Sequence, residues 1–211
     1  MTDYCFITGD SFEEDSLLWS PSAGQLISHA HQLVFDTFAK GGQGNFYILD
    51  SIIKNISLKN YKLAVVNWSS IYRHDYITNF SNWQVDRKNI TFKNSHFSEQ
   101  DHILYESLLH IVSAQNIFEK HGIPYVMWWG IHPGHTTNNQ KCLELIDLID
   151  SKKTFFNIHL EEINYLSSAY THAKKIDCIH ESDNKHPNQE AHRRWSLIIL
   201  DFMEKNNIKI K

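Results

Sequence analysis

Cysteine, long apolar runs and an excess of charge of either sign are all scarce in this sequence. The three cysteines, Cys5, Cys142 and Cys178, are odd in number and far apart. They predict free buried thiols in a reducing compartment rather than a disulfide framework. No apolar run approaches the roughly 20 residues that span a bilayer, and the first residues show no signal-peptide pattern. A net charge of -4 gives no general attraction to nucleic acid or to an anionic membrane. We therefore expect a cytoplasmic protein that binds neither nucleic acid nor a membrane.

Glycine is also sparse, whereas aromatic residues make up 13% of the chain. Aromatic side chains can line a carbohydrate-binding cleft, but a dense hydrophobic core uses them equally well, and we favour the core. The 211 residues, 42% of them hydrophobic, suffice for one α/β domain with a full core. We expect a single domain over residues 1–211.

Short apolar runs alternate with amphipathic segments along the chain. Runs rich in aromatic and β-branched residues predict strands at 4–8, 61–66 and 124–129, and a short edge strand at 155–158. Apolar residues at helical spacing predict helices at 26–39, 46–56, 99–121, 141–150, 161–173 and 189–204. Helix followed by strand is the rhythm of β-α-β units, which build parallel sheets. Residues 74–100 interrupt it, and their weak alternation predicts an inserted hairpin or lid.

Gly9-Asp10-Ser11 directly follows the first predicted strand. Gly9 permits a sharp turn, so the next two residues lie just beyond the carboxyl end of the strand. In open α/β sheets ligands bind in the crevice at that edge. A serine there can act as a nucleophile if a base reaches it. The acidic residues that follow, Glu13, Glu14 and Asp15, predict a solvated turn.

A candidate base stands near the other end of the chain, in Asp183-Asn184-Lys185-His186-Pro187. Pro187 biases His186 to an extended conformation and predicts a loop that opens a helix. Asp183, three residues earlier, is close enough to hold the imidazole. Serine, histidine and an orienting carboxylate are the parts of an acyl-transfer triad. The neighbouring His180 and Glu181 compete for the roles of base and orienting acid.

With Gly9-Asp10-Ser11 beside the first strand and Asp183-x-x-His186-Pro187 near the C-terminal end, the chain resembles the SGNH (GDSL) hydrolase superfamily over nearly its whole length. The resemblance implies a three-layer α/β/α sandwich, flavodoxin-like, with a mostly parallel sheet and no cofactor. It also implies that Ser11 is the nucleophile, His186 the base and Asp183 its orienting acid, and it favours this pair over the competing one.

The resemblance further implies an oxyanion hole, in which the backbone N–H of Ser11 contributes. The glycine-rich segment 40–45 matches the family's second motif, with Gly42 as the donor, although a simple turn between helices explains the glycines too. After the second strand the family has Gly-x-Asn-Asp, and this chain departs from that pattern. Alignment by strand end puts Ser69 on the asparagine position, with Asn67 as a second candidate donor. Losing one such donor costs ~10²–10³ in rate.

Four residues near these motifs are expected to contact the substrate: Asp10, Asn45, Trp68 and Arg73. Arg73 favours an anionic or polyhydroxyl substrate, or else pairs with a surface carboxylate. His132 and His135 lie on a glycine- and proline-containing loop without ligands at zinc-site spacing, so we expect no metal.

Hydrolysis of a small-molecule or glycan ester, for instance removal of an acetyl group from a sugar, is the expected activity. An acyltransferase using the same site is one alternative. A glycan-binding protein that keeps the fold without the chemistry is another, and the missing Gly-x-Asn-Asp favours it.

Overall fold

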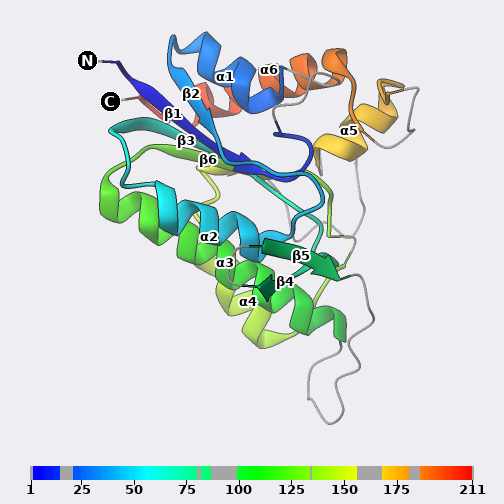
Figure 1. The fold of residues 1–211 in the computed structure, drawn as a ribbon. Coiled ribbons are helices and arrows are strands. Elements are labelled where there is room, and N and C mark those ends of the chain that lie inside the picture. Colours follow the sequence, from blue (N-terminus) through cyan, green and yellow to red (C-terminus); the bar gives the residue numbers. More distant parts are fainter. Residues whose placement is uncertain are drawn as a thin grey trace.

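The computed structural model describes residues 2–14, 21–79, 82–86, 99–133, 135–155, 168–180 and 186–210. Its centre is a five-stranded sheet in the order β2-β1-β3-β6-β7, in which every neighbouring pair is parallel (Figure 1). The strands are β1 (Tyr4–Gly9), β2 (Val34–Thr37), β3 (Tyr61–Trp68), β6 (Tyr125–Trp129) and β7 (Thr154–Phe155). The described helices are α1 (Ala23–Ala30), α2 (Asn45–Asn55), α3 (Glu99–His121), α4 (Gln140–Asp147), α5 (Ala169–Lys175) and α6 (Gln189–Lys205).

Helices cover both faces of the sheet, with α1, α5 and α6 on one side and α2, α3 and α4 on the other (Figure 1). Successive side chains of a strand point to opposite faces, and the core follows that alternation. On β3, Ala64, Val66 and Trp68 join the cluster beneath α2 and α3, whereas Leu63 and Val65 join the cluster beneath α1 and α6. The three-layer α/β/α sandwich with a parallel sheet is therefore confirmed.

One predicted helix is wrong in its second half. Residues 26–39 do not form one helix: α1 ends at Ala30, Gln32 takes a left-handed conformation with φ of 58°, and β2 follows. Two hydrogen bonds hold the turn between α1 and β2, one from Leu33 N to Ser28 O and one from Ser28 Oγ to Leu33 O. The predicted edge strand at 155–158 meets β7 at Phe155, and the end of the predicted helix at 161–173 overlaps α5; the rest of both predictions falls on residues 156–167, outside the described part of the chain.

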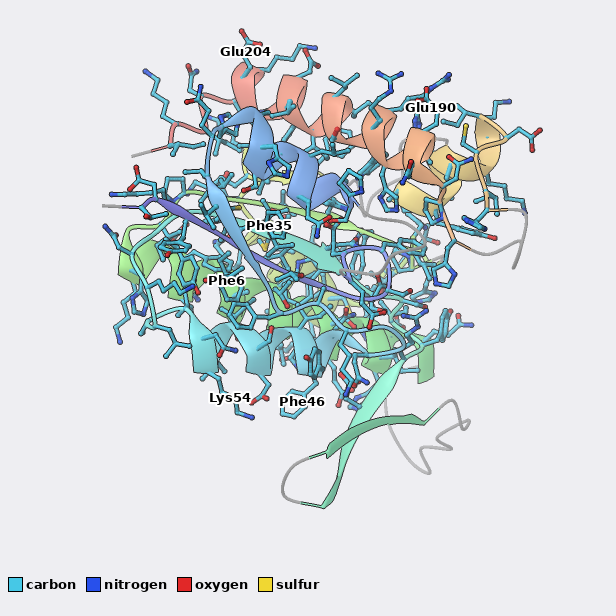
Figure 2. The ribbon with its side chains drawn as sticks, turned by 45° about the horizontal axis from the view of Figure 1, so that its top comes forward. Phe6, Phe35, Phe46, Lys54, Glu190 and Glu204 are labelled. Atoms are coloured by element: carbon cyan, nitrogen blue, oxygen red, sulfur yellow. The ribbon has the colours of Figure 1, made fainter. Side chains whose placement is uncertain are left out.

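Within 74–100, the predicted insertion, the structure shows β4 (His74–Asn79) and β5 (Asn82–Asp86), which pair antiparallel as a sheet of their own. This hairpin extends away from the sandwich (Figure 2). Asp75 ties it to α2, because its carboxylate accepts from Gly44 N and from Tyr47 N, each at 2.6 Å. Gly44 is the N-cap of α2 and has no side-chain oxygen, so Asp75 supplies the missing cap.

All the parallel strands run in one direction, so their carboxyl ends share one edge of the sheet. The segments that leave β1, β3 and β6 there carry Ser11, Arg73 and Gly130. The two chain ends lie together at the opposite end of the sandwich (Figure 1). None of the described helices has the length and apolarity needed to cross a bilayer.

Candidate active site

The nucleophile candidate Ser11 stands on a tight turn after β1. The turn closes through a bond from Glu13 N to Asp10 O (3.1 Å), and Phe12 N donates to the Asp10 carboxylate (3.0 Å). Gly9 is needed for close approach and not for a turn conformation: its φ is not positive, but a Cβ there would lie 2.9 Å from Asn67 O on β3. The absence of a side chain lets β1 and β3 approach behind the serine.

His186 meets Ser11 across a separation of 175 residues: its Nε2 lies 3.0 Å from Ser11 Oγ. Two backbone bonds hold the segment that carries it, from His180 N to His186 O (2.8 Å) and from Asn188 N to Cys178 O (2.9 Å). Asn188 then caps α6 through a bond from Ala191 N to its side chain. The serine and the imidazole therefore have the relative placement that proton transfer requires.

The competing base is placed differently. His180 supports the backbone of His186, and it is His186 whose ring nitrogen faces Ser11. Glu181 and Asp183 lie outside the described residues, so the orienting carboxylate stays a prediction. His192, on α6, is buried, and its burial first, then the charge of His186, lowers its pKa to about 4. It is therefore neutral at pH 7.

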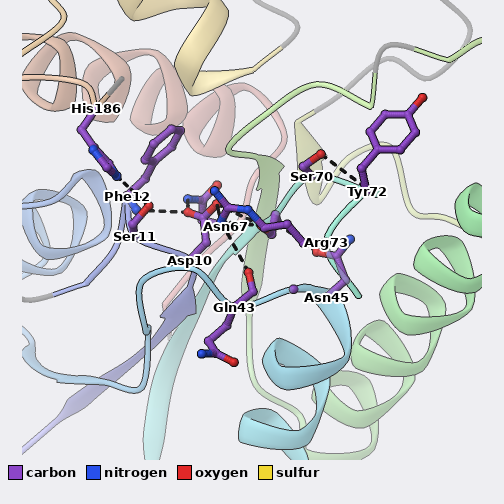
Figure 3. A network of polar contacts seen from close by, with 12 residues as sticks. Asp10, Ser11, Phe12, Gln43, Asn45, Asn67, Ser70, Tyr72, Arg73 and His186 are labelled. Carbon is purple, nitrogen blue, oxygen red and sulfur yellow. Dashed lines mark hydrogen bonds and ion pairs between the residues drawn. The ribbon is translucent and has the colours of Figure 1, made fainter. Parts of the chain in front are cut away.

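Asp10 is the centre of a buried polar network beside the nucleophile (Figure 3). Its Oδ1 accepts from Phe12 N (3.0 Å) and Asn67 Nδ2 (3.2 Å), and its Oδ2 accepts from Ser69 Oγ (3.1 Å) and Arg73 Nη1 (3.2 Å). Burial raises the pKa of this carboxyl; the Arg73 charge is the largest effect opposing that rise. Four donors on two oxygens are the pattern of an ionised carboxylate held by hydrogen bonds.

Three residues expected to contact the substrate instead support the site from within. Asp10 and Trp68 are fully buried, the latter in the core beneath α2 and α3. Asn45 is 3% exposed, accepts from Ser69 N (2.8 Å) and donates to Ser107 Oγ (3.1 Å), so it joins β3, α2 and α3. The structure therefore does not place these three side chains where a substrate could touch them. Arg73, with 16% of its side chain exposed, is the one of the four that reaches solvent.

The predicted side-chain donors of the oxyanion hole are directed elsewhere. The single hydroxyl proton of Ser69 goes to Asp10, and the amide of Asn67 donates to the same carboxylate. Ser69 also accepts from Arg73 Nη1 at 3.0 Å. Both side chains thus position Asp10 and Arg73 in this structure.

The glycine-rich loop before α2 lies beside Ser11. A Cβ on Gly41 would be 3.6 Å from Ser11 Cβ, and Gly42, the predicted backbone donor, follows it with a φ of 77°. A carboxylate oxygen of Glu14 occupies the space next to Gly41, 2.5 Å from where that Cβ would stand. The loop is therefore close enough to the serine to contribute backbone groups to the site.

Glu13 was missed by the sequence, which predicts a solvated acidic turn there. It is 1% exposed and accepts from Ser22 Oγ and Gly24 N, both at 2.8 Å, at the start of α1. Burial raises its pKa to about 8. No local pattern distinguishes it from its acidic neighbours, because its burial depends on where α1 docks.

The histidine loop after β6 has a partner of its own. His135 Nε2 lies 2.8 Å from Asp101 Oδ1 on α3. Over the ranges that the structure describes, no group of three or more histidine, cysteine or acidic side chains is arranged to hold a metal ion.

Comparison with known proteins gives structural relatives only. Neither a family model nor a curated protein matches the sequence. Among solved structures, a protein described as an SGNH hydrolase from Slackia heliotrinireducens superposes with a TM-score of 0.53 at 11% identity, over 96% of this chain and 100% of that one. The psychrotrophic esterase EstA from Pseudoalteromonas sp., in a structure inhibited by monoethylphosphonate, gives 0.52 at 12% identity, over 96% and 97%.

An acetyl xylan esterase from the rumen bacterium Butyrivibrio proteoclasticus gives a TM-score of 0.51 at 14% identity, over 97% of this chain and 64% of that one. These likenesses confirm the fold of SGNH hydrolases and esterases that the sequence motifs imply.

Proposed function

We propose that this protein is a serine esterase of the SGNH type. The observation that carries the proposal is the 3.0 Å approach of His186 Nε2 to Ser11 Oγ, at the carboxyl edge of the sheet. Most serines and histidines have no catalytic role, but a serine on a tight turn after the first strand, facing an imidazole, is the arrangement of an activated nucleophile.

In the first half of the reaction His186 takes the proton of Ser11 as the hydroxyl attacks the ester carbonyl. The tetrahedral intermediate collapses when the same imidazole returns that proton to the departing alcohol. A water molecule, deprotonated by His186, then attacks the acyl-serine and releases the acid. Asp183 fixes the tautomer of the imidazole and stabilises its protonated form. The N–H groups of Ser11 and Gly42 face the oxygen that becomes negative.

The substrate class that we propose is an O-acetylated carbohydrate. Two points support it: a small acyl group suits a nucleophile that is only 5% exposed, and one structure of similar fold is described as an acetyl xylan esterase.

The test is hydrolysis of p-nitrophenyl acetate by the wild-type protein and by Ser11→Ala. We expect kcat to fall by at least ~10³-fold, because removal of a triad nucleophile leaves only binding and electrostatic effects. Ser70→Ala is the matched control, since in the described part of the chain the Ser70 hydroxyl is bonded only by Tyr72 N, at 3.3 Å.

A fluorophosphonate should label the wild-type protein at Ser11 and leave Ser11→Ala unlabelled. Equal hydrolysis by the two proteins, or none by either, would contradict the esterase and favour a glycan-binding protein. Transfer of the acetyl group to an added sugar in preference to water would favour an acyltransferase.

A further inference from the structure

The oxyanion of the proposed reaction lacks the side-chain donors that the sequence predicts. Ser69 and Asn67 each direct their hydrogen-bond donors to Asp10. Neither can turn to a substrate without leaving a buried carboxylate short of a partner, which is costly. Any side-chain hydrogen bond to the oxyanion, in addition to those from backbone N–H groups, must therefore come from a different residue.

Arg73 has hydrogen-bond donors that the buried network does not use. A guanidinium carries five N–H groups, and in this structure only Nη1 is used, toward Asp10 Oδ2 (3.2 Å), Ser69 Oγ (3.0 Å) and Gln43 O (3.5 Å). Among the described residues, Nε and Nη2 have no hydrogen-bond partner. The Arg73 side chain as a whole remains 16% exposed, so the guanidinium is not sealed in the core as Asp10 is.

The position of Arg73 suits this task. In the view of Figure 3, Ser11 lies between the His186 ring and the Arg73 guanidinium, which reaches Asp10, the residue next to the nucleophile. Through Asp10, whose Oδ2 lies 3.2 Å from Nη1, the guanidinium is anchored to the residue that precedes Ser11 in the chain. We infer that Arg73 is a catalytic residue, the side-chain donor of the oxyanion hole, and that Ser69, Asn67 and Asp10 are positioning residues that hold it; the inference rests on the proposed esterase function.

The network supplies the preorganisation that such a donor needs. Because Asp10 balances its charge and three oxygens fix Nη1, the guanidinium keeps its place throughout the reaction. Donors held in place before the charge develops are the effective form of this stabilisation.

A purely structural role is the competing explanation, since Arg73 also neutralises the buried Asp10. Two pairs of proteins separate the roles: Arg73→Met against wild type, and Asp10→Asn/Arg73→Met against Asp10→Asn. The Asp10→Asn background has no negative charge to neutralise. A structural Arg73 is then dispensable there, whereas an oxyanion donor is not.

For p-nitrophenyl acetate we expect Arg73→Met to lower kcat ~10²–10³-fold in both backgrounds, the cost of one oxyanion donor, with KM moving less than about threefold. A trifluoromethyl ketone, which adds to the serine as an anionic hemiketal, should lose affinity by a similar factor. Equal kcat and inhibitor affinity for Asp10→Asn and Asp10→Asn/Arg73→Met would overturn the assignment.

Arg73→Lys covers the case in which the methionine variants or Asp10→Asn do not fold, as checked by thermal melting. Lysine keeps the ion pair with Asp10 but lacks the free guanidinium edge, so kcat should fall at least ~10-fold while the melting temperature stays near that of wild type. Wild-type kcat in Arg73→Lys would count against the proposal. Failure of the esterase itself is distinguishable, because it shows in the wild-type protein and in its lack of dependence on Ser11.

Discussion

Two buried carboxyl groups follow one another closely on the turn that carries Ser11; burial raises the pKa of both, but their partners differ. Asp10 is paired with the Arg73 guanidinium and accepts three further bonds. Glu13 accepts only from neutral donors, and no ion pair joins it to a basic side chain in the described part of the chain. Its raised pKa of about 8 follows from that burial, with a further push from the nearby Asp10.

Glu13 should make stability depend on pH, in a direction fixed by its raised pKa. Its ordinary pKa is 4.5, and the folded value is about 8. Below pH 4.5 both states are protonated and the stability is intact; between 4.5 and 8 only the unfolded state ionises, so the free energy of unfolding falls as pH rises, and above 8 the loss is complete. Glu13→Gln, which keeps an acceptor for both bonds, should exceed wild type by up to a few kcal/mol at pH 9.

Urea unfolding at pH 5, 7 and 9 measures this effect. Glu204→Gln, at an exposed position on α6 (Figure 2), is the control and should show no growing difference from wild type. A constant offset between Glu13→Gln and wild type at all three pH values would mean that Glu13 is ionised in the folded protein.

Individual residues also show what the sequence could and could not predict. Ser11 was predicted because it lies just after the end of a strand, and His186 because it precedes a proline at the start of a helix. Trp68 was expected to contact the substrate but is buried, as the parity that it shares with Ala64 and Val66 on a doubly covered strand requires. The side chain of Asn45 is hydrogen-bonded to residues as distant in sequence as Ser107, and no local sequence pattern predicts such bonds.

Among the elements, α2 depends on a residue that belongs to another element. Asp75 on β4 accepts from Gly44 N and Tyr47 N, as an N-cap side chain would. Asp75→Ala should lower the free energy of unfolding by ~0.5–2 kcal/mol, the usual value of an N-cap, with a contribution from the helix dipole. Chemical denaturation measures it.

The control for that measurement is Asp201→Ala. Asp201 pairs with Lys205 on the exposed face of α6, and such pairs contribute ~0–1 kcal/mol. Equal small losses in the two variants would show that Asp75 does not act as a cap.

Among the described elements, the wrong prediction for the second half of 26–39 has a physical explanation. Leu33 and Val34 fit helical spacing and strand alternation equally well. The deciding feature is the left-handed conformation of Gln32, a residue whose type gives no signal for it. The pairing of β2 with β1 then compensates for that conformation.

At the scale of the whole molecule, the parallel sheet was predictable from the β-α-β rhythm, whereas that rhythm does not predict that Ser11 and His186 meet. Ser11 and His186 come together because the inner face of α6 packs against the sheet and α1. The resemblance carried by two short motifs, and not any local periodicity, connected Ser11 with His186.

That packing should govern activity as well as stability. Ile199→Ala, at a fully buried position of α6, should lower the free energy of unfolding by ~2–5 kcal/mol. Leu197→Ala on the same helix, at a position 53% exposed, should change it by less than ~0.5 kcal/mol. On heating, loss of p-nitrophenyl acetate hydrolysis should coincide with melting of each protein. Activity lost well below the melting transition of wild type would mean that the site opens independently of α6.

The two chain ends lie together, at the end of the sandwich opposite the edge that carries Ser11. A fluorescent protein or an affinity handle attached to either one would sit far from Ser11 and leave that edge of the sheet unobstructed. The same closeness allows a short peptide to join both ends and new ends to be cut elsewhere, giving a rearranged chain in which the 175-residue separation of Ser11 and His186 shrinks to a few tens of residues.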